Sequence, residues 1–89
     1  MKHRYLEVTY RKGKPIAAYL YFPRELGSKA VRTEDAGQGF RIDYDHTDRP
    51  LGIEITAPSL ATPERLDEIM QRLGQQPLHS HEWAPLKAA

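Results

Sequence analysis

Residues 39–55 carry the most constraining pattern in this chain, because apolar and polar side chains alternate on both sides of a short polar segment. Alternation with a period of two is typical of a strand with one buried face, and two such runs around turn residues predict a β-hairpin. The register of such a hairpin can be predicted residue by residue. The pattern therefore constrains the fold, and it leaves the biochemical activity open.

The register follows if Thr47 and Asp48 are the two central residues of the turn. On the opposite face from the core, Arg41 then lies across from Glu54 as an opposite-charge pair. On the core face the predicted apolar pairs are Tyr44 with Leu51, Ile42 with Ile53, and Phe40 with Ile55. A shift of one residue would set apolar side chains against polar ones, so this register is favoured.

Other segments have clear strand or helix character. Residues 3–10 alternate, residues 15–22 are apolar on both faces, and residues 29–35 are polar enough to form an edge strand. The segment 11–14 predicts a turn in which Gly13 supplies a positive φ. Residues 62–73 predict a helix with Thr62 as the N-cap, Gly74 just past the end, and an apolar stripe made of Leu66, Ile69, Met70 and Leu73.

The fold class predicted from these elements is α+β: a single antiparallel β-meander sheet of about five strands, with one C-terminal amphipathic helix on one face. Residues 1–74 form one domain in this interpretation, and residues 75–89 form a C-terminal tail or arm. We expect Leu78 and Trp83 to dock on the domain or on a neighbouring subunit, and the tail to be loose otherwise.

The composition narrows the class of protein. The chain has 89 residues and no cysteine, so we expect one domain without disulfides or thiolate chemistry. Residues 1–32 contain eight basic and two acidic residues, and the remainder contains five basic and ten acidic residues. This asymmetry indicates a basic binding surface or, as we favour, charge pairing between the two halves. No apolar run follows Met1 or is long enough to span a bilayer, so we expect a cytoplasmic protein of bacterial type.

The two-sided apolar strand and the exposed sheet edges predict a surface that another protein covers. We expect a homodimer, or a regulatory or antitoxin-like partner, to contact Tyr5, Tyr19, Tyr21 and Trp83. The alternative is an RNA- or DNA-binding module, because basic groups beside exposed rings are typical nucleic-acid contacts. Its candidate contacts are Arg4, Arg11, Lys12 and Lys14. The near-neutral net charge favours protein contacts.

A metal site is the second alternative, in one of two places. Asp43, Asp45 and Glu54 share a face and could bind a hard cation, although Arg41 opposite Glu54 would neutralise one carboxylate. The other place is the segment 79–82, where His79 and His81 would be two ligands and the third would come from Glu82, His3 or His46. We expect neither a resident metal nor a cofactor. The sequence has no nucleophile elbow and no phosphate-binding glycine loop, so we expect no enzymatic activity.

Seven hairpin residues also coincide with a family pattern: Asp43, Tyr44, Asp45, Gly52, Ile53, Glu54 and Ile55. With them, residues 39–55 resemble a bacterial family of small proteins, the domain-of-unknown-function family numbered 2283, which reads roughly G-V-x-V-D-Y-D-x-D-G-x-x-V-G-I-E-I. Residues 17–22 resemble its second-strand motif more weakly, and the resemblance covers about residues 3–57. It implies a small antiparallel domain of no established activity, some members of which look like partners of toxin-like proteins. The chain departs from the family at Asp48, where a turn glycine is usual, and at Ile16, where an acidic residue is usual.

Overall fold

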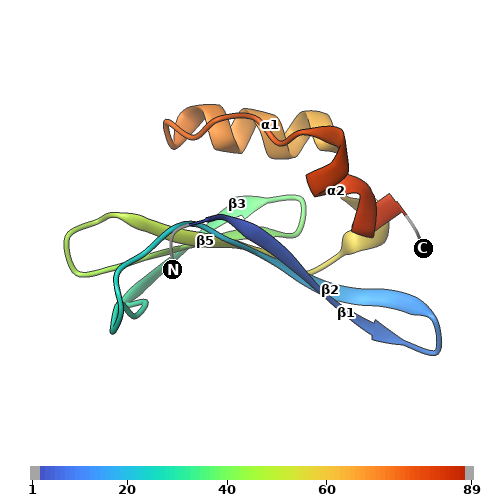
Figure 1. The fold of residues 1–89 in the computed structure, drawn as a ribbon, viewed down its shortest axis with the longest axis horizontal. Helices are drawn as coiled ribbons and strands as arrows, with labels where there is room; N and C mark the ends of the chain where they lie inside the picture. The colour runs from blue at the N-terminus through green and yellow to red at the C-terminus, as the bar shows by residue number, and fades with distance from the viewer. Residues whose placement is uncertain (1–2, 88–89) are drawn as a thin grey trace.

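In the computed structural model, which describes residues 3–87, five strands form one antiparallel sheet and the helices lie on one of its faces (Figure 1). The strands are β1 (Tyr5–Arg11), β2 (Lys14–Tyr21), β3 (Arg32–Gly37), β4 (Phe40–Tyr44) and β5 (Pro50–Ile55). A short 3₁₀ helix, η1 (Pro58–Leu60), precedes α1 (Pro63–Arg72) and α2 (Ser80–Lys87). The predicted α+β class and antiparallel sheet are confirmed.

The strand order β1-β2-β5-β4-β3 differs from the predicted meander, which would place β3 next to β2. Instead β5 pairs with β2, and the segment between β2 and β3 passes the ends of β5 and β4 to reach the outer edge. Burial explains the difference. Leu51, Ile53 and Ile55 of β5 are all at most 1 % exposed, whereas β3 has the polar sequence RTEDAG. A central position buries more apolar area for β5 than it would for β3.

The β4–β5 register confirms the prediction except next to the turn. Phe40 pairs with Ile55, Ile42 with Ile53 and Arg41 with Glu54, but a β-bulge pairs Tyr44 with Pro50 instead of Leu51. The turn is also longer than predicted. The amide of Asp45 donates to the carbonyl of Arg49, and Asp48 has a left-handed φ of 63°. This is the geometry of a three-residue hairpin loop whose left-handed position usually holds glycine.

Helix α1 forms where the sequence predicts it. The hydroxyl of Thr62 accepts a hydrogen bond of 3.2 Å from the amide of Arg65, which caps the helix, and Pro63 occupies the first turn. Leu66, Ile69 and Met70 are buried at 1 % exposure or less against the sheet. The apolar stripe is therefore stabilised by packing on the strands, as a helix of this length requires.

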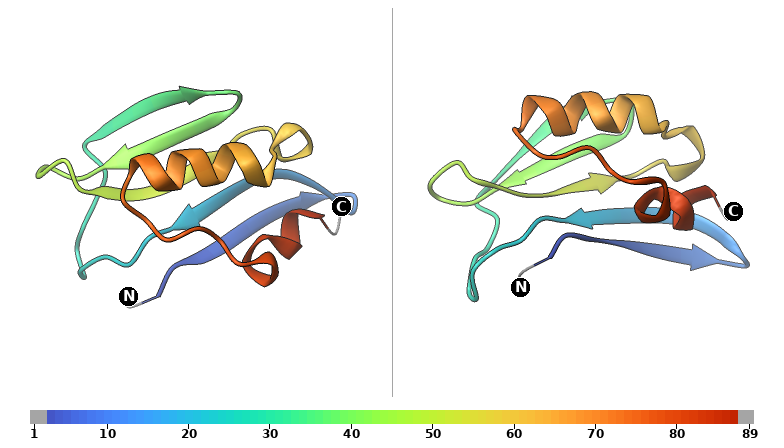
Figure 2. Two further views of the ribbon diagram at one scale, coloured as in Figure 1. Left: turned by 90° about the horizontal axis from the view of Figure 1, so that it is seen from above. Right: turned by 45° about the horizontal axis from the view of Figure 1, so that its top comes forward.

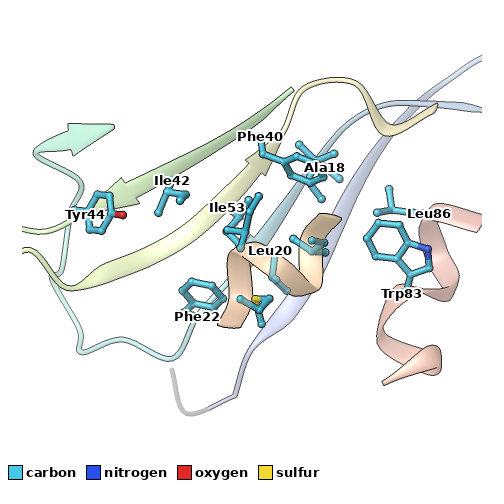
Figure 3. Packing of buried hydrophobic residues seen from close by; sticks show 13 residues of the cluster. Ala18, Leu20, Phe22, Phe40, Ile42, Tyr44, Ile53, Trp83 and Leu86 are labelled. Atoms are coloured by element: carbon cyan, nitrogen blue, oxygen red, sulfur yellow. The ribbon is translucent and has the colours of Figure 1, made fainter. Parts of the chain in front are cut away.

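The prediction of a single C-terminal helix is wrong, because residues 80–87 form α2. Trp83 and Leu86 of α2 are only 5 % and 7 % exposed and extend the same core as Leu20 (Figure 3). Figure 2 shows α2 over β1 at the outer edge of the sheet, beside the region covered by α1. Pro85 lies inside α2, where proline is unusual, and the sequence of α2 has no amphipathic period, so the pattern did not reveal this helix.

Candidate protein-interaction surface

The sheet face turned away from α1 and α2 carries two rows of residues that each cross all five strands. We call this surface the open face. The first row is Tyr5, Tyr21, Gly52, Asp43 and Thr33, and the second is Glu7, Tyr19, Glu54, Arg41 and Asp35. Because side chains alternate along a strand, these residues point away from the core. Figure 1 shows both helices on the other side of the sheet.

Three tyrosines that the sequence proposes as interface residues gather on the open face. The rings of Tyr5 and Tyr21 are stacked with centroids 4.6 Å apart, and the rings of Tyr19 and Tyr21 are tilted with centroids 4.5 Å apart. We call these three residues the tyrosine cluster. Tyr5 is 46 % exposed, and the guanidinium of Arg24 lies 5.4 Å from the ring centroid of Tyr21. Trp83, the fourth proposed interface residue, is buried in the core instead.

Gly52 and Asp43 hold Tyr19 in place. A Cβ at Gly52 would collide with the Tyr19 ring and would lie 2.7 Å from the carbonyl oxygen of Leu20, so only glycine lets the ring lie across β5. The Tyr19 hydroxyl then donates a 2.7 Å hydrogen bond to Asp43, which also accepts one of 2.6 Å from Thr33. Burial, together with the Asp43 carboxylate, raises the pKa of Tyr19, so its hydroxyl stays protonated and donating at neutral pH.

The other hairpin residues marked by the family resemblance also have structural roles. The Asp45 carboxylate accepts hydrogen bonds from the amides of Thr47 and Arg49 and from the Thr47 hydroxyl, which lowers the pKa of Asp45 and closes the loop. Tyr44 lies on the helix side and donates a 2.8 Å hydrogen bond to Glu34. Glu54 lies across from Arg41 as predicted, and these two described side chains form no ion pair.

The structure does not bring the proposed nucleic-acid contacts to the tyrosine cluster. Arg4 is held by Glu82, with Nε 2.8 Å from Oε2, and by the carbonyls of Gln76 and Pro77. The hydrogen bond from Arg4 lowers the pKa of Glu82 to about 2. Arg11, Lys12 and Lys14 lie in and beside the β1–β2 turn, about 13 to 23 Å along the strands from the two rows, by the rise of roughly 3.3 Å per residue.

Apart from Glu54, the carboxylates proposed for a metal are engaged in hydrogen bonds within the protein. Asp43 and Asp45 accept the hydrogen bonds described above, and Glu82 binds Arg4 and the amide of His79. The rings of His79 and His81 are stacked with centroids 5.6 Å apart. Within residues 3–87, no group of three or more His, Cys, Asp or Glu side chains is arranged to hold a metal ion.

The segment between β2 and β3 borders the open face, which was not predicted from the sequence. Tyr5, Tyr21, Arg24 and Leu26 are among the residues that line a shallow hollow of about 250 Å³ at the end of the first row. Leu26 is fully exposed there. A leucine within the mostly polar run of residues 24–29 is a signal that could have pointed to this place.

A comparison of the chain with protein-family models, with curated proteins and with solved structures finds no match. The resemblance of residues 39–55 to the domain-of-unknown-function family therefore stays a prediction. Over the described part of the chain, no helix is long and apolar enough to cross a membrane.

Proposed function

We propose that this chain is a non-catalytic protein-interaction module that binds its partner through the open face. The tyrosine cluster is the observation that carries the proposal, because it presents stacked, partly exposed rings on a five-stranded sheet. Tyrosine is enriched at protein interfaces, since it offers a large apolar ring and a polar hydroxyl with few rotatable bonds.

The hydrogen bonds within the open face support this proposal, because they order the surface before any partner binds. The Tyr19 hydroxyl is held by its hydrogen bond to Asp43, and the Tyr19 ring lies in the space that Gly52 leaves by having no side chain. Tyr21 donates a 3.3 Å hydrogen bond to Glu7 and stacks on Tyr5. A preorganised surface loses less side-chain entropy on binding, so more of its contact energy appears as affinity.

The partner in this proposal is either a second copy of the chain or a different protein that the module regulates, as an antitoxin-like protein would. We expect this to take place in the cytoplasm of a bacterium. The β1–β2 turn supports nucleic-acid binding as a second candidate function, because Arg11, Lys12 and Lys14 are exposed together there.

A quantitative pull-down from source cells tests the proposal with matched variants. Tyr5→Thr/Tyr21→Thr removes two rings of the cluster and replaces them with β-branched side chains, which are favourable in strands. Glu68→Ala/Gln71→Ala changes the exposed side of α1 and serves as the control. We expect wild type and the control to enrich a partner protein. The tyrosine variant should not enrich it, although its circular dichroism spectrum stays native. Equal recovery with all three proteins would contradict the proposal.

A further inference from the structure

The open face is acidic, and from this we infer that its partner is a basic polypeptide segment rich in arginine. This inference rests on the proposed function and specifies the chemistry of the partner. The two rows contain the guanidinium of Arg41, and Arg24 adds a second over Tyr21, against the four carboxylates of Glu7, Asp35, Asp43 and Glu54. The whole chain has a net charge of +1, so the negative excess belongs to this face and not to the protein in general.

Two of these carboxylates, those with the weakest contacts within the protein, are the most available to a partner. The Asp43 carboxylate already accepts hydrogen bonds from Tyr19 and Thr33. Asp35 accepts a 2.8 Å hydrogen bond from the amide of Gly37. Glu7 is exposed and accepts only the 3.3 Å hydrogen bond from Tyr21. Glu54 is half-buried in the middle of the sheet, and Arg41 opposite does not pair with it.

The available carboxylates flank an aromatic ring. Glu7, Tyr19 and Glu54 are consecutive members of the second row, on β1, β2 and β5. Neighbouring strands are roughly 4.8 Å apart, so the two carboxylates are attached about 10 Å from each other with a tyrosine between them. An extended segment with cationic side chains can reach both, and the tyrosines add faces on which a guanidinium stacks. The protein already contains such a contact, that of Arg24 on Tyr21.

Two other kinds of partner, a second copy of the chain and a nucleic acid, fit the open face less well. A second copy packed open face to open face would bring the same negative excess together from both sides, which opposes a two-fold dimer through this surface. Nucleic acid would bring its phosphates to the carboxylates, while Arg4 is bound to Glu82 and the other basic residues lie at the β1–β2 turn.

Fluorescence anisotropy with a labelled peptide of alternating arginine and glycine tests the inference. Glu7→Gln/Glu54→Gln removes the two available charges, and Glu64→Gln/Glu68→Gln removes two charges from α1 as the matched control. We expect wild type and control to bind the peptide alike and the open-face variant to bind it about fivefold more weakly. Raising the salt concentration should weaken the binding. A peptide of alternating glutamate and glycine and a single-stranded oligonucleotide should not bind the open face.

Failure of this inference differs from failure of the proposed function. The inference is overturned if the arginine peptide does not bind, if both variants weaken its binding equally, or if the oligonucleotide binds wild type and Tyr5→Thr/Tyr21→Thr abolishes that binding. It is also overturned if light scattering shows a dimer that Tyr5→Thr/Tyr21→Thr abolishes, although the proposed function then stands. If that tyrosine variant loses no partner in the pull-down, the proposed function fails whatever the peptide does.

Discussion

Replacing Gly52 by alanine should damage the open face more than any other single methyl group added there. The new Cβ would collide with the ring of Tyr19 and lie 2.7 Å from the backbone oxygen of Leu20. A backbone oxygen moves only if its strand moves, so β2 and β5 have to separate locally. The Tyr19 ring is displaced at the same time, which removes its hydrogen bond to Asp43.

The expected loss of stability from Gly52→Ala is about 3 kcal/mol. Overpacking of a well-packed site costs about 1 to 3 kcal/mol. Loss of a hydrogen bond to a charged group costs about 1.5 to 3 kcal/mol, and alanine recovers about 0.5 to 1 kcal/mol relative to glycine in a strand. For a domain of this size, about 3 kcal/mol corresponds to a fall of roughly 15 °C in the melting temperature.

Urea unfolding monitored by the fluorescence of Trp83, the only tryptophan, measures this change. Trp83 lies in the core on the other side of the sheet, so it reports global unfolding. Tyr19→Phe is the companion variant, because it keeps the ring and loses the hydroxyl. We expect Tyr19→Phe to cost about 1.5 kcal/mol in the wild type and much less in the Gly52→Ala background. A Gly52→Ala protein within about 0.5 kcal/mol of wild type would refute the role assigned to Gly52.

Three further predictions concern the turn, the α2 anchor and the core. Asp48→Gly should raise the free energy of unfolding by about 0.5 kcal/mol, because Asp48 has a φ of 63° and its exposed ion pair with Arg32 contributes little; a lower urea midpoint would contradict this. Glu82→Gln should cost about 1 to 2 kcal/mol at neutral pH. The pKa of Glu82 is lowered from 4.5 to about 2, so this stabilisation is complete above the unfolded-state pKa and fades as the pH falls toward the folded-state pKa. Urea titrations should therefore show wild type and variant converging in acid, and a gap independent of pH would exclude the mechanism. Leu66→Ala should cost about 3 kcal/mol because Leu66 is 0 % exposed, and Leu60→Ala, at a site 75 % exposed, should change the urea midpoint little.

Local pattern was sufficient to predict the hairpin and α1. Alternation fixed which face of β4 and β5 is buried, and Thr62 with the stripe through Leu66 fixed α1. The pattern could not supply the strand order, since that depends on which strand gains most from a central position. The polar character of residues 29–35 predicted an edge strand, whereas a meander would place this third strand in the middle of the sheet. In the structure it is the edge strand β3.

The candidate surface was predictable only in part for the same reason. The excess of tyrosine on residues 15–22 indicated Tyr19 and Tyr21 from alternation alone. Their acidic neighbourhood was not visible, because Asp43 and Glu54 come beside Tyr19 only when β5 lies between β2 and β4. The burial of Trp83 was not predicted because α2 has no amphipathic period. The ion pair of Arg4 was not predicted because its partner, Glu82, lies at the other end of the chain.

Amide chemical-shift mapping by NMR tests most directly whether the open face is the binding surface. The isotope-labelled protein is titrated with the arginine–glycine peptide, and each perturbed amide is assigned to a strand or helix. We expect the perturbations to follow the two rows, with the largest at Glu7, Tyr19 and Glu54 and little change along the exposed side of α1. Perturbations confined to α1, α2 or the β1–β2 turn would contradict the account.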